Sequence, residues 1–376
     1  MRILFVHSIG KKKFGGGERW VVNAASGLKS KGHEVFAACR KNSVLSNELH
    51  KEGIHLIGFN LYSNISLYQV FRLSRIIRKN RIDVVICKGH ELTVSGIAAR
   101  WRNNALLIRR SGSPPPSKSL KLYYRTKWFT DGVVTNTHTI KEIFQHHGFT
   151  EKDFVKVIYN GLKVDDEVQP FDFSANYPGK TIVLSIGRAV GHKGYYHLID
   201  ALPAIAEIYP DLFFFVIGDG KEKEQLIRYA LKKGVENKIK FAGYIHHPVP
   251  YIKGCDLFLH PSLYEGMPNA AMEAMAYGKP VIMTRVNGAD ELSENGKYAY
   301  LIPPADPDSI VGAVKKAMEN KASFEKMGED AGLFVRENFS MQKMVDYLEA
   351  YILERMKLKQ NNSLKQSSNG NIRMDH

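Results

Sequence analysis

The sequence predicts an α/β protein built from two doubly wound, mainly parallel sheets, each in its own domain. Short β-branched and aromatic runs alternate with segments of helical spacing, which is typical of successive βα units. This alternation stops in a polar stretch at residues 160–180 and then starts again. The length of 376 residues also exceeds the size of one ordinary core and suits two domains.

The N-terminal half opens with the clearest βα unit. Residues 2–7 predict a buried strand, a glycine loop ends at Gly17, and residues 18–31 have helical spacing that stops at Gly32. Further strands are expected at residues 35–38, 83–87, 105–108, 132–135 and 155–159. We therefore expect a first doubly wound domain at residues 1–165.

The C-terminal half repeats this pattern after a linker that Pro170 and Pro178 mark within the polar stretch. Strands are expected at residues 181–185, 212–217, 239–242, 257–260 and 281–284, which gives a second domain at residues 175–340. Residues 341–356 predict an amphipathic helix. Residues 357–376 are poor in apolar residues and predict a disordered tail.

Charge and cysteine content narrow the class of protein. Residues 1–170 hold 28 Lys+Arg against 13 Asp+Glu, so this half carries the whole formal net charge of +15. Such asymmetry favours an anionic substrate or membrane surface beside this half, although a basic surface kept for solubility fits equally well. The cysteines, Cys39, Cys87 and Cys255, lack disulfide or metal spacing. We expect a cytoplasmic protein without an export or membrane-spanning segment.

The most informative segment follows the expected strand at residues 257–260. Pro268 suits the first turn of a helix and Gly278 its C-terminal stop, which places Glu265 in the loop and Glu273 on the helix. Helix amides can hold a diphosphate while carboxylates accept hydrogen bonds from sugar and ribose hydroxyls. Alone, the two glutamates are also compatible with a loop charge and a solvated helix face.

A second segment follows the first strand of the same domain and contains Gly187, Arg188, Gly191, Lys193 and Gly194. Arginine can bind two phosphoryl oxygens with its planar fork, and lysine can add a point charge. A surface turn with incidental basic residues is the alternative. Because α/β proteins bind ligands where parallel strands end, we expect both segments to form one nucleotide-sugar site.

Together these segments resemble the motifs of retaining glycosyltransferase family 4, and the resemblance covers nearly the whole chain. Near the N-terminus it rests on the glycine run that ends at Gly17, followed by Glu18, and before the linker on Asn160-Gly161. In the C-terminal half it rests on Gly187-Arg188, Lys193-Gly194, Gly218-Asp219-Gly220, Phe241-x-Gly243, Glu265-Gly266 and Glu273-Ala274-Met275-Ala276.

The resemblance implies a GT-B architecture, in which two Rossmann-like domains face a cleft and the C-terminal helix returns to the N-terminal domain. It implies that Arg188 and Lys193 hold the pyrophosphate of the donor, that Glu273 binds the ribose, and that the backbone near Tyr244 meets the base. The other donor-binding residues that it implies are Gly16, Gly17, Gly187, Glu265, Gly266, Met267, Pro268 and Asn269. The glycine run could equally be a hinge.

The acceptor side departs from the family pattern. Many relatives carry a histidine after an N-terminal strand, at the place where this sequence has Arg110. His90 follows another strand and is a second acceptor-side candidate, although a solvated loop histidine is an equal alternative. No Asp-x-Asp follows a strand, so no metal is expected at the donor, and Arg188 and Lys193 would neutralise the leaving phosphate instead.

We therefore expect a retaining, metal-independent glycosyltransferase that needs no cofactor and takes a sugar from a nucleotide diphosphate, with a UDP-sugar as the expected donor. Glu265, Arg188 and Lys193 are the expected catalytic residues. A glycan or lipid-linked acceptor is expected, as in polysaccharide or lipopolysaccharide synthesis. With no convincing carboxylate nucleophile, same-face attack is the preferred route. The alternatives are a nucleotide-sugar epimerase, a phosphorylase, an inactive scaffold and a basic nucleic-acid-binding protein, for which no module is recognised.

Overall fold

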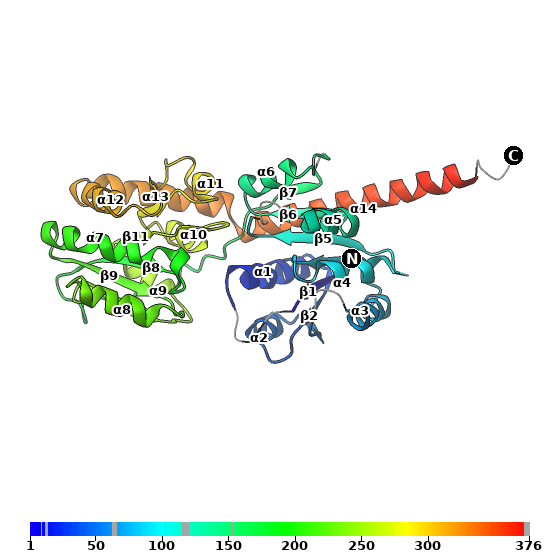
Figure 1. The fold of residues 1–376 in the computed structure, drawn as a ribbon, viewed down its shortest axis with the longest axis horizontal. Coiled ribbons are helices and arrows are strands. Elements are labelled where there is room, and N and C mark those ends of the chain that lie inside the picture. The colour runs from blue at the N-terminus through cyan, green and yellow to red at the C-terminus, as the bar shows by residue number, and fades with distance from the viewer. Residues whose placement is uncertain are drawn as a thin grey trace. The chain divides into compact units, whose positions relative to one another are not determined.

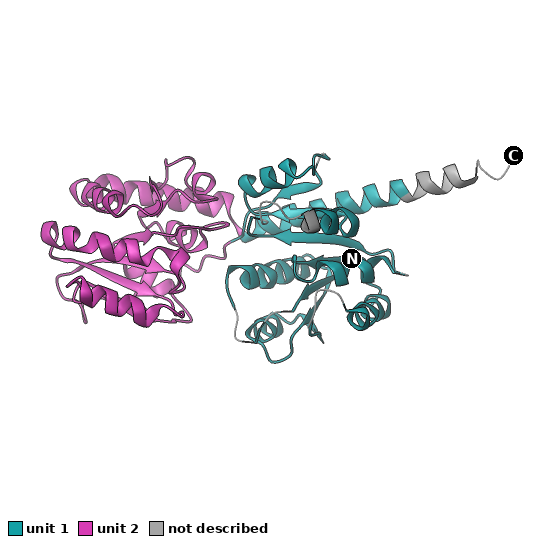
Figure 2. Ribbon diagram, in the orientation of Figure 1, with its two compact units in different colours: residues 1–161, 341–376 teal, residues 162–340 magenta. Residues whose placement is uncertain are grey.

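The computed structural model describes residues 1–8, 10–11, 14–61, 66–101, 103–114, 120–151 and 153–371, without the side chains of residues 120–122 and 363–371. The chain forms two compact units (Figure 2). Unit 1 comprises residues 1–161 and 341–376, and unit 2 comprises residues 162–340. Each unit is built on its own parallel sheet, as the alternation of strands and helices predicted.

The sheet of unit 1 has the strand order β3-β2-β1-β4-β5-β6-β7, and Figure 1 labels its strands β1, β2, β5, β6 and β7. Successive strands are therefore added toward one edge of the sheet from β1 to β3 and toward the other edge from β4 to β7. The topological switch point of the unit lies between β1 and β4. The strands are β1 (Arg2–His7), β2 (Glu34–Cys39), β3 (His55–Gly58), β4 (Val84–Cys87), β5 (Leu106–Ser111), β6 (Gly132–Thr135) and β7 (Val155–Val157).

Helices cover both faces of this sheet. One apolar core joins the sheet to α1 and α14, and a second core joins the opposite face to α3 and α4. Side chains of Ser43, Ser66 and Thr137 cap α2, α3 and α6 by accepting hydrogen bonds from backbone amides. The helices are α1 (Gly16–Ser30), α2 (Val44–Lys51), α3 (Leu67–Lys79), α4 (Leu92–Arg100), α5 (Leu120–Phe129), α6 (His138–His146) and α14 (Met341–Asn371).

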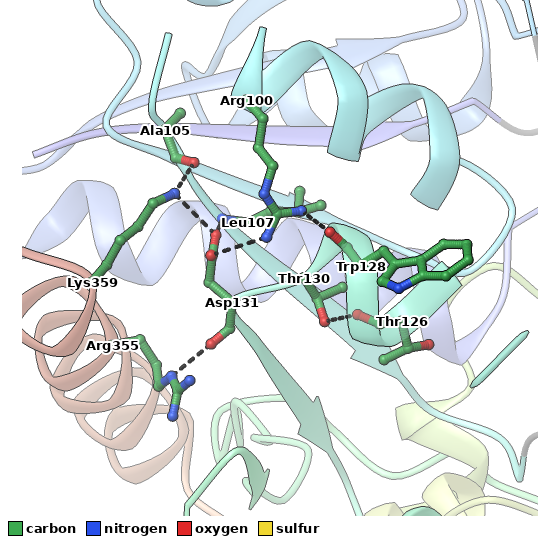
Figure 3. Close-up of polar contacts among 9 residues, drawn as sticks. All are labelled: Arg100, Ala105, Leu107, Thr126, Trp128, Thr130, Asp131, Arg355 and Lys359. Carbon is green, nitrogen blue, oxygen red and sulfur yellow. Dashed lines mark hydrogen bonds and ion pairs between the residues drawn. The ribbon is translucent and has the colours of Figure 1, made fainter. Parts of the chain in front are cut away.

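The C-terminal helix α14 packs on unit 1, as expected, and Asp131 is the polar centre of this contact (Figure 3). Arg355 Nε donates to the Asp131 carbonyl at 2.6 Å, and Lys359 Nζ contacts the Asp131 carboxylate at 3.2 Å. The same carboxylate accepts from the Leu107 amide at 2.7 Å. The helix thus continues beyond residue 356, and the tail expected to be disordered is ordered at least as far as Lys359. Residues 372–376 lie outside the described chain.

Unit 2 has the strand order β10-β9-β8-β11-β12-β13, with its switch point between β8 and β11. The strands are β8 (Thr181–Ile186), β9 (Leu212–Ile217), β10 (Ile239–Gly243), β11 (Leu257–His260), β12 (Val281–Thr284) and β13 (Tyr300–Ile302). The helices are the 3₁₀ turn η1 (Gly191–Lys193), α7 (Tyr195–Ile208), α8 (Lys223–Lys232), α9 (Val249–Gly254), α10 (Asn269–Ala276), α11 (Ala289–Ser293), α12 (Pro307–Glu319) and α13 (Lys321–Asn338).

The polar stretch that predicted a linker differs from this expectation, because residues 162–180 belong to unit 2. Phe171 stacks on Tyr251 with ring centroids 4.3 Å apart, and Phe173 is buried beside them. Asp166 forms a two-point ion pair with Arg336 at 2.7 and 2.8 Å. The aromatic side chains at odd positions anchor a segment whose overall composition is polar.

Candidate functional site

Two loops meet at the switch point of unit 2. The loop after β8 contains η1, and the loop after β11 contains Glu265. The Leu263 amide donates to the His192 carbonyl at 2.8 Å and joins the two loops. Because β8 and β11 are neighbours whose connections leave toward opposite sides, a ligand can enter between their carboxyl ends.

Glycine permits the close approach of these loops. Gly194 has φ of +72°, and a Cβ on it would lie 1.8 Å from the Pro261 carbonyl oxygen. Gly218, after β9, has φ of +142°, and its Cβ would lie 1.9 Å from the Gly187 carbonyl oxygen. No side chain can occupy these positions without separating the loops, since both the backbone angle and the space exclude it. The glycines of the motifs therefore hold three loops together.

Glu265 is the polar centre of the site. Its Oε1 accepts hydrogen bonds from Lys193 Nζ, from His260 Nε2 at 3.0 Å and from Ser262 Oγ at 3.0 Å. Ser262 in turn is fixed by Thr284, whose hydroxyl donates to the Ser262 carbonyl. All three contacts use Oε1, and no described contact involves Oε2, which leaves that oxygen as an acceptor for a ligand hydroxyl.

Electrostatics keep Glu265 ionised. Burial disfavours its charge, but the hydrogen bond from His260 and the positive charge of Lys193 lower the pKa of Glu265 to about 2. Complete burial lowers the pKa of His260 despite the neighbouring carboxylate, so its imidazole is neutral near pH 7. Lys193 therefore supplies the positive charge of this cluster. A carboxylate with so low a pKa is a weak base and a good hydrogen-bond acceptor.

The helix α10 follows the Glu265 loop directly. Met267 and Pro268 are buried, and the Pro268 carbonyl accepts from the Met272 amide in the first turn. Asn269 and Gly266 are half-buried beside this helix start, and Glu273 is half-buried on the helix itself. The N-terminal end of α10 thus points its amides toward the same side of the sheet as Glu265.

Other predicted donor residues lie on the surrounding loops. Arg188 is exposed after β8, and within the described chain no hydrogen bond or ion pair holds its guanidinium. The Gly187 carbonyl accepts from the Tyr195 hydroxyl at 3.1 Å, which fixes the start of this loop. Tyr244 is 66% exposed after β10. The structure thus joins Lys193 and Glu265 directly, whereas Arg188 and Tyr244 remain open to solvent.

Unit 1 has its own polar cluster at the switch point between β1 and β4. His7 Nε2 lies 2.7 Å from Glu18 Oε1, and His7 Nδ1 lies 3.4 Å from Glu91 Oε1. Lys88 Nζ donates to Glu18 at 3.0 Å. Burial disfavours the charged imidazole, but the hydrogen bonds to Glu18 and Glu91 raise the pKa of His7. In the same cluster, His7 and Lys88 outweigh burial and lower the pKa of Glu18 to about 2.

The glycine run lies beside this cluster. Helix α1 begins at Gly16, two residues before the expected start, so Gly16 and Gly17 form its first turn. A Cβ on Gly17 would lie 2.3 Å from Lys88 Nζ, so the glycine leaves room for the lysine. The amide of Gly15 donates to Glu18 Oε2 at 2.9 Å. The run is therefore a helix start packed against a cation.

The two acceptor-side candidates differ in their surroundings. His90 is exposed on the loop after β4, whereas Arg110 is buried on β5. Arg110 Nη2 donates to Asn160 Oδ1 at 2.9 Å, and its guanidinium lies 4.8 Å from the centre of the Trp20 ring. Across the described ranges, no group of three or more His, Cys, Asp or Glu side chains is arranged to hold a metal ion.

Sequence reasoning missed several members of these clusters. His260 and Ser262 flank the predicted loop, and the signal for them was a histidine that ends an otherwise apolar strand. His7 ends β1 in the same way, and Glu18 follows the glycine run. Lys88 lies 70 positions from Glu18, and only the adjacency of β1 and β4 brings them together.

Comparisons with known proteins match both halves of the chain. The model of the family described as glycosyl transferases group 1 matches residues 169–362. The model described as Glycosyltransferase Family 4 matches residues 14–166. The first match covers more than half of the chain and contains unit 2 almost completely.

Similar proteins and structures were also found. The lipopolysaccharide core biosynthesis glycosyltransferase LpsE of Rhizobium meliloti is 26% identical over 341 residues, with 89% of this chain and 94% of that protein covered. The UDP-Gal:alpha-D-GlcNAc-diphosphoundecaprenol alpha-1,3-galactosyltransferase of Escherichia coli is 24% identical, with 85% and 88% covered. The crystal structure of Anabaena HepE with UDP and glucose has a TM-score of 0.81 at 22% identity, with 94% and 100% covered.

Proposed function

The chain belongs to the glycosyl transferases group 1 family, and on this premise we propose that it is a retaining, metal-independent glycosyltransferase with a UDP-sugar bound in unit 2. Glycosyltransferase activity itself follows from the family. The observation that carries the finer proposal is the Lys193–Glu265 pair at the switch point of unit 2, held between two loops that glycine brings into contact. UDP is bound in the similar HepE structure.

The pair suggests a division of labour around the donor. Negative charge develops on the leaving diphosphate as the glycosidic bond breaks, and Lys193 with the exposed Arg188 can neutralise it. Glu265 Oε2 can accept hydrogen bonds from the transferred sugar, while Glu273 on α10 is assigned to the ribose. The backbone near Tyr244 is assigned to the base, and the amides of residues 266–269 are further contacts to the donor.

Glu265 is unsuited to act as the general base. Its pKa of about 2 leaves little driving force for taking a proton from an acceptor hydroxyl. Its three hydrogen bonds also hold the carboxylate in place, which suits binding better than nucleophilic attack. We therefore propose that the acceptor attacks on the face from which the diphosphate leaves, with the phosphate taking the acceptor's proton.

The acceptor is proposed to be a glycan or a lipid-linked sugar bound by unit 1. Relatives that act in lipopolysaccharide core biosynthesis or on a diphosphoundecaprenol-linked sugar support this class. Unit 1 holds 33 Lys+Arg against 14 Asp+Glu, which favours an anionic membrane surface at the inner face of the cytoplasmic membrane. No helix among the described residues is long and apolar enough to cross a membrane.

Ligand-dependent unfolding tests the donor assignment. A ligand that binds only the native state stabilises it by about 2.7 kcal/mol at 100 times its Kd. At equal concentrations the nucleotide with the lowest Kd raises the thermal midpoint most, so UDP should raise it more than GDP or ADP. The shift should persist in EDTA if the site needs no metal. Lys193→Gln should reduce the UDP shift, while Lys315→Gln, at an exposed site on α12, should leave it unchanged.

Sugar transfer tests the role of Glu265. Glu265→Gln should lower the rate about 100- to 1000-fold, as removal of a key polar contact to the reacting centre does in other enzymes. No glycosyl-enzyme adduct should accumulate in the wild type or the variant. Trapping of such an adduct by mass spectrometry would refute same-face attack, and an EDTA-sensitive rate would refute metal independence.

A further inference from the structure

Three polar residues stand in one row across the sheet of unit 1. Strand register pairs Val6 with Cys87 and Cys87 with Arg109, so that the following residues, His7, Lys88 and Arg110, lie side by side. All three are expected on the face that α1 and α14 cover, since Phe5, Ile86 and Ile108, two residues before them along each strand, belong to the core on that face. These three residues therefore border the apolar core of this face along the C-terminal ends of the strands, which we call the carboxyl edge of the sheet.

Arg110 differs from the other two residues in its pairing. His7 and Lys88 both contact Glu18, whereas the partners of Arg110 within the described ranges are the neutral Asn160 and the Trp20 ring. Arg110 is 5% exposed, and its Nε and Nη1 have no hydrogen-bond partner among the described residues. Buried guanidinium groups are normally paired with a carboxylate, so this one lacks its usual counter-charge.

Burial alone lowers the pKa of Arg110, to about 9, and no nearby carboxylate opposes that change. The group therefore stays charged at pH 7 and is stabilised little by the protein. The described carboxylates of this edge contact groups other than Arg110: Glu18 bonds to His7, Lys88 and the Gly15 amide, and Glu91 Oε1 accepts from the Ser8 amide. An unpaired charge kept at this position indicates that a ligand completes the pairing.

Gly112 shows where such a ligand would reach the guanidinium. It is an exposed residue of the loop after β5, and a Cβ on it would lie 2.8 Å from Arg110 Nη1. Among the described residues, Nη1 therefore lies against an exposed loop position that has no side chain. Asn160 holds Nη2 and Trp20 holds the plane of the guanidinium, so Nε and Nη1 are fixed in orientation.

We propose that Arg110 is the receptor for an oxyanion of the acceptor, a phosphate or a carboxylate group, bound by Nε or Nη1 at the carboxyl edge of unit 1. This inference rests on the proposed function, in which unit 1 takes the acceptor. It specifies an acceptor that carries a negative charge, and it makes Arg110 a binding residue for that charge. Phosphate and carboxylate share this chemistry, and the experiment separates them.

The test measures anion binding to the full chain with the donor site already filled. Saturating UDP is added first, and its thermal shift reports on unit 2 independently of Arg110. Inorganic phosphate and acetate are then titrated separately, against chloride at equal ionic strength. We expect a further thermal shift in the wild type, and the anion that binds more tightly identifies the acceptor group as a phosphate or a carboxylate. The affinity for that anion should be about 10- to 100-fold lower in Arg110→Gln.

Three variants separate binding from structure. Arg110→Lys keeps the positive charge and should retain part of the anion-dependent thermal shift. Gly112→Ala keeps the arginine itself but should weaken the anion-dependent shift, because the added methyl group displaces Nη1. Arg2→Gln removes one positive charge from the opposite edge of the same sheet and should leave the shift unchanged. The proposal is overturned if neither anion shifts the wild type, or if Arg110→Gln and Arg2→Gln behave alike.

The same titrations distinguish this proposal from the proposed function. A UDP shift without an anion shift would overturn the role of Arg110 and leave the donor assignment intact. An anion shift that depends on Arg110 without a UDP shift would overturn the donor assignment and leave the oxyanion site. In acceptor kinetics, Arg110→Gln should raise KM for the acceptor and leave KM for the donor unchanged.

Discussion

Glu265 couples the donor site to acid stability at the scale of a single residue. Its pKa falls from 4.5 to about 2 on folding, so its contribution to stability is complete above pH 4.5 and is lost as the pH falls toward 2. The depression corresponds to about 3 kcal/mol. Between pH 5 and pH 2 the wild type should lose about that much more stability than Glu265→Gln, in denaturant unfolding followed as a function of pH.

The exposed Glu319 on α12 supplies the control for this measurement. Glu319→Gln should follow the wild-type pH profile, because its carboxylate is solvated in the folded state as well. An identical acid limb in the wild type and in Glu265→Gln would show that the contacts of Lys193 and His260 do not stabilise the carboxylate. The donor-site electrostatics would then need another account.

At this scale the sequence predicted part of each site. Lys193 and Glu265 were found because each stands in a short segment with glycines at fixed spacing, and their direct contact fits the single site expected from two strand ends. The motif pattern gives Glu18 no role, because its partner Lys88 follows β4, 70 positions further along the chain. Arg110 was named as an acceptor-side residue, but its missing counter-charge depends on burial, which sequence does not show.

At the scale of elements, the loops of the donor site depend on one glycine contact. Gly194 and Gly278 share a φ of +72°, but only at Gly194 would a Cβ collide with backbone, 1.8 Å from the Pro261 carbonyl oxygen. Gly278→Ala should cost about 1–2 kcal/mol for the left-handed conformation. Gly194→Ala should cost about 2–5 kcal/mol and should also weaken UDP binding, because the loops after β8 and β11 must separate.

Denaturant unfolding and the UDP-dependent thermal shift of both variants measure these effects. The comparison isolates the close approach, since the strain in φ is the same at both positions. Equal losses of stability and of UDP affinity in the two variants would mean that the contact between the loops has no role in forming the donor site.

The helix α14 shows what elements add beyond the sequence pattern. Composition predicted disorder from residue 357, yet Lys359 contacts Ala105 and Asp131 (Figure 3). Asp131→Asn should destabilise the protein by about 1–3 kcal/mol, because charged hydrogen bonds to Lys359 and to the Leu107 amide weaken. In equilibrium unfolding, Asp346→Asn, which removes a partly exposed ion pair between α14 and Lys31, should change stability far less.

A stability loss for Asp131→Asn as small as that for Asp346→Asn would contradict the docking role of Asp131.

The strands were predictable almost throughout, because a buried parallel strand is a continuous apolar run. The edge strands β3 and β13 were missed. They are short and only partly buried, so their residues lack this signal.

At the scale of the whole molecule, the two units differ in net charge. Unit 2 holds 20 Lys+Arg against 24 Asp+Glu, so unit 1 carries more than the entire positive net charge of the chain. Exposed aromatic side chains lie on α3, on α5 and after α4 of the same unit, and we call the following set the aromatic surface: Tyr68, Phe71, Trp101, Tyr124 and Trp128.

These helices are neighbours, and the rings form one pair between elements and one pair within α5. Phe71 and Trp101 have centroids 6.1 Å apart, and Tyr124 and Trp128 have centroids 5.2 Å apart. Basic side chains interleave with the rings on α3, α4 and α5, at Arg72, Arg75, Arg78, Lys79, Arg100 and Lys127. Tyrosine and tryptophan favour the headgroup region of a bilayer, and basic residues near it contribute about 1 kcal/mol each on an anionic leaflet.

We expect the chain to bind vesicles that contain phosphatidylglycerol and not vesicles of phosphatidylcholine alone, with binding that weakens as salt rises. Co-sedimentation measures both. Removing the aromatic surface at Trp101 and Trp128 by alanine should reduce binding to anionic vesicles, because the rings that insert between headgroups are lost. Tyr347→Ala, on α14 at the opposite face of the same sheet, should bind as the wild type does. Equal binding by the Trp101→Ala/Trp128→Ala variant and by Tyr347→Ala would exclude α3 to α5 as the membrane-facing side.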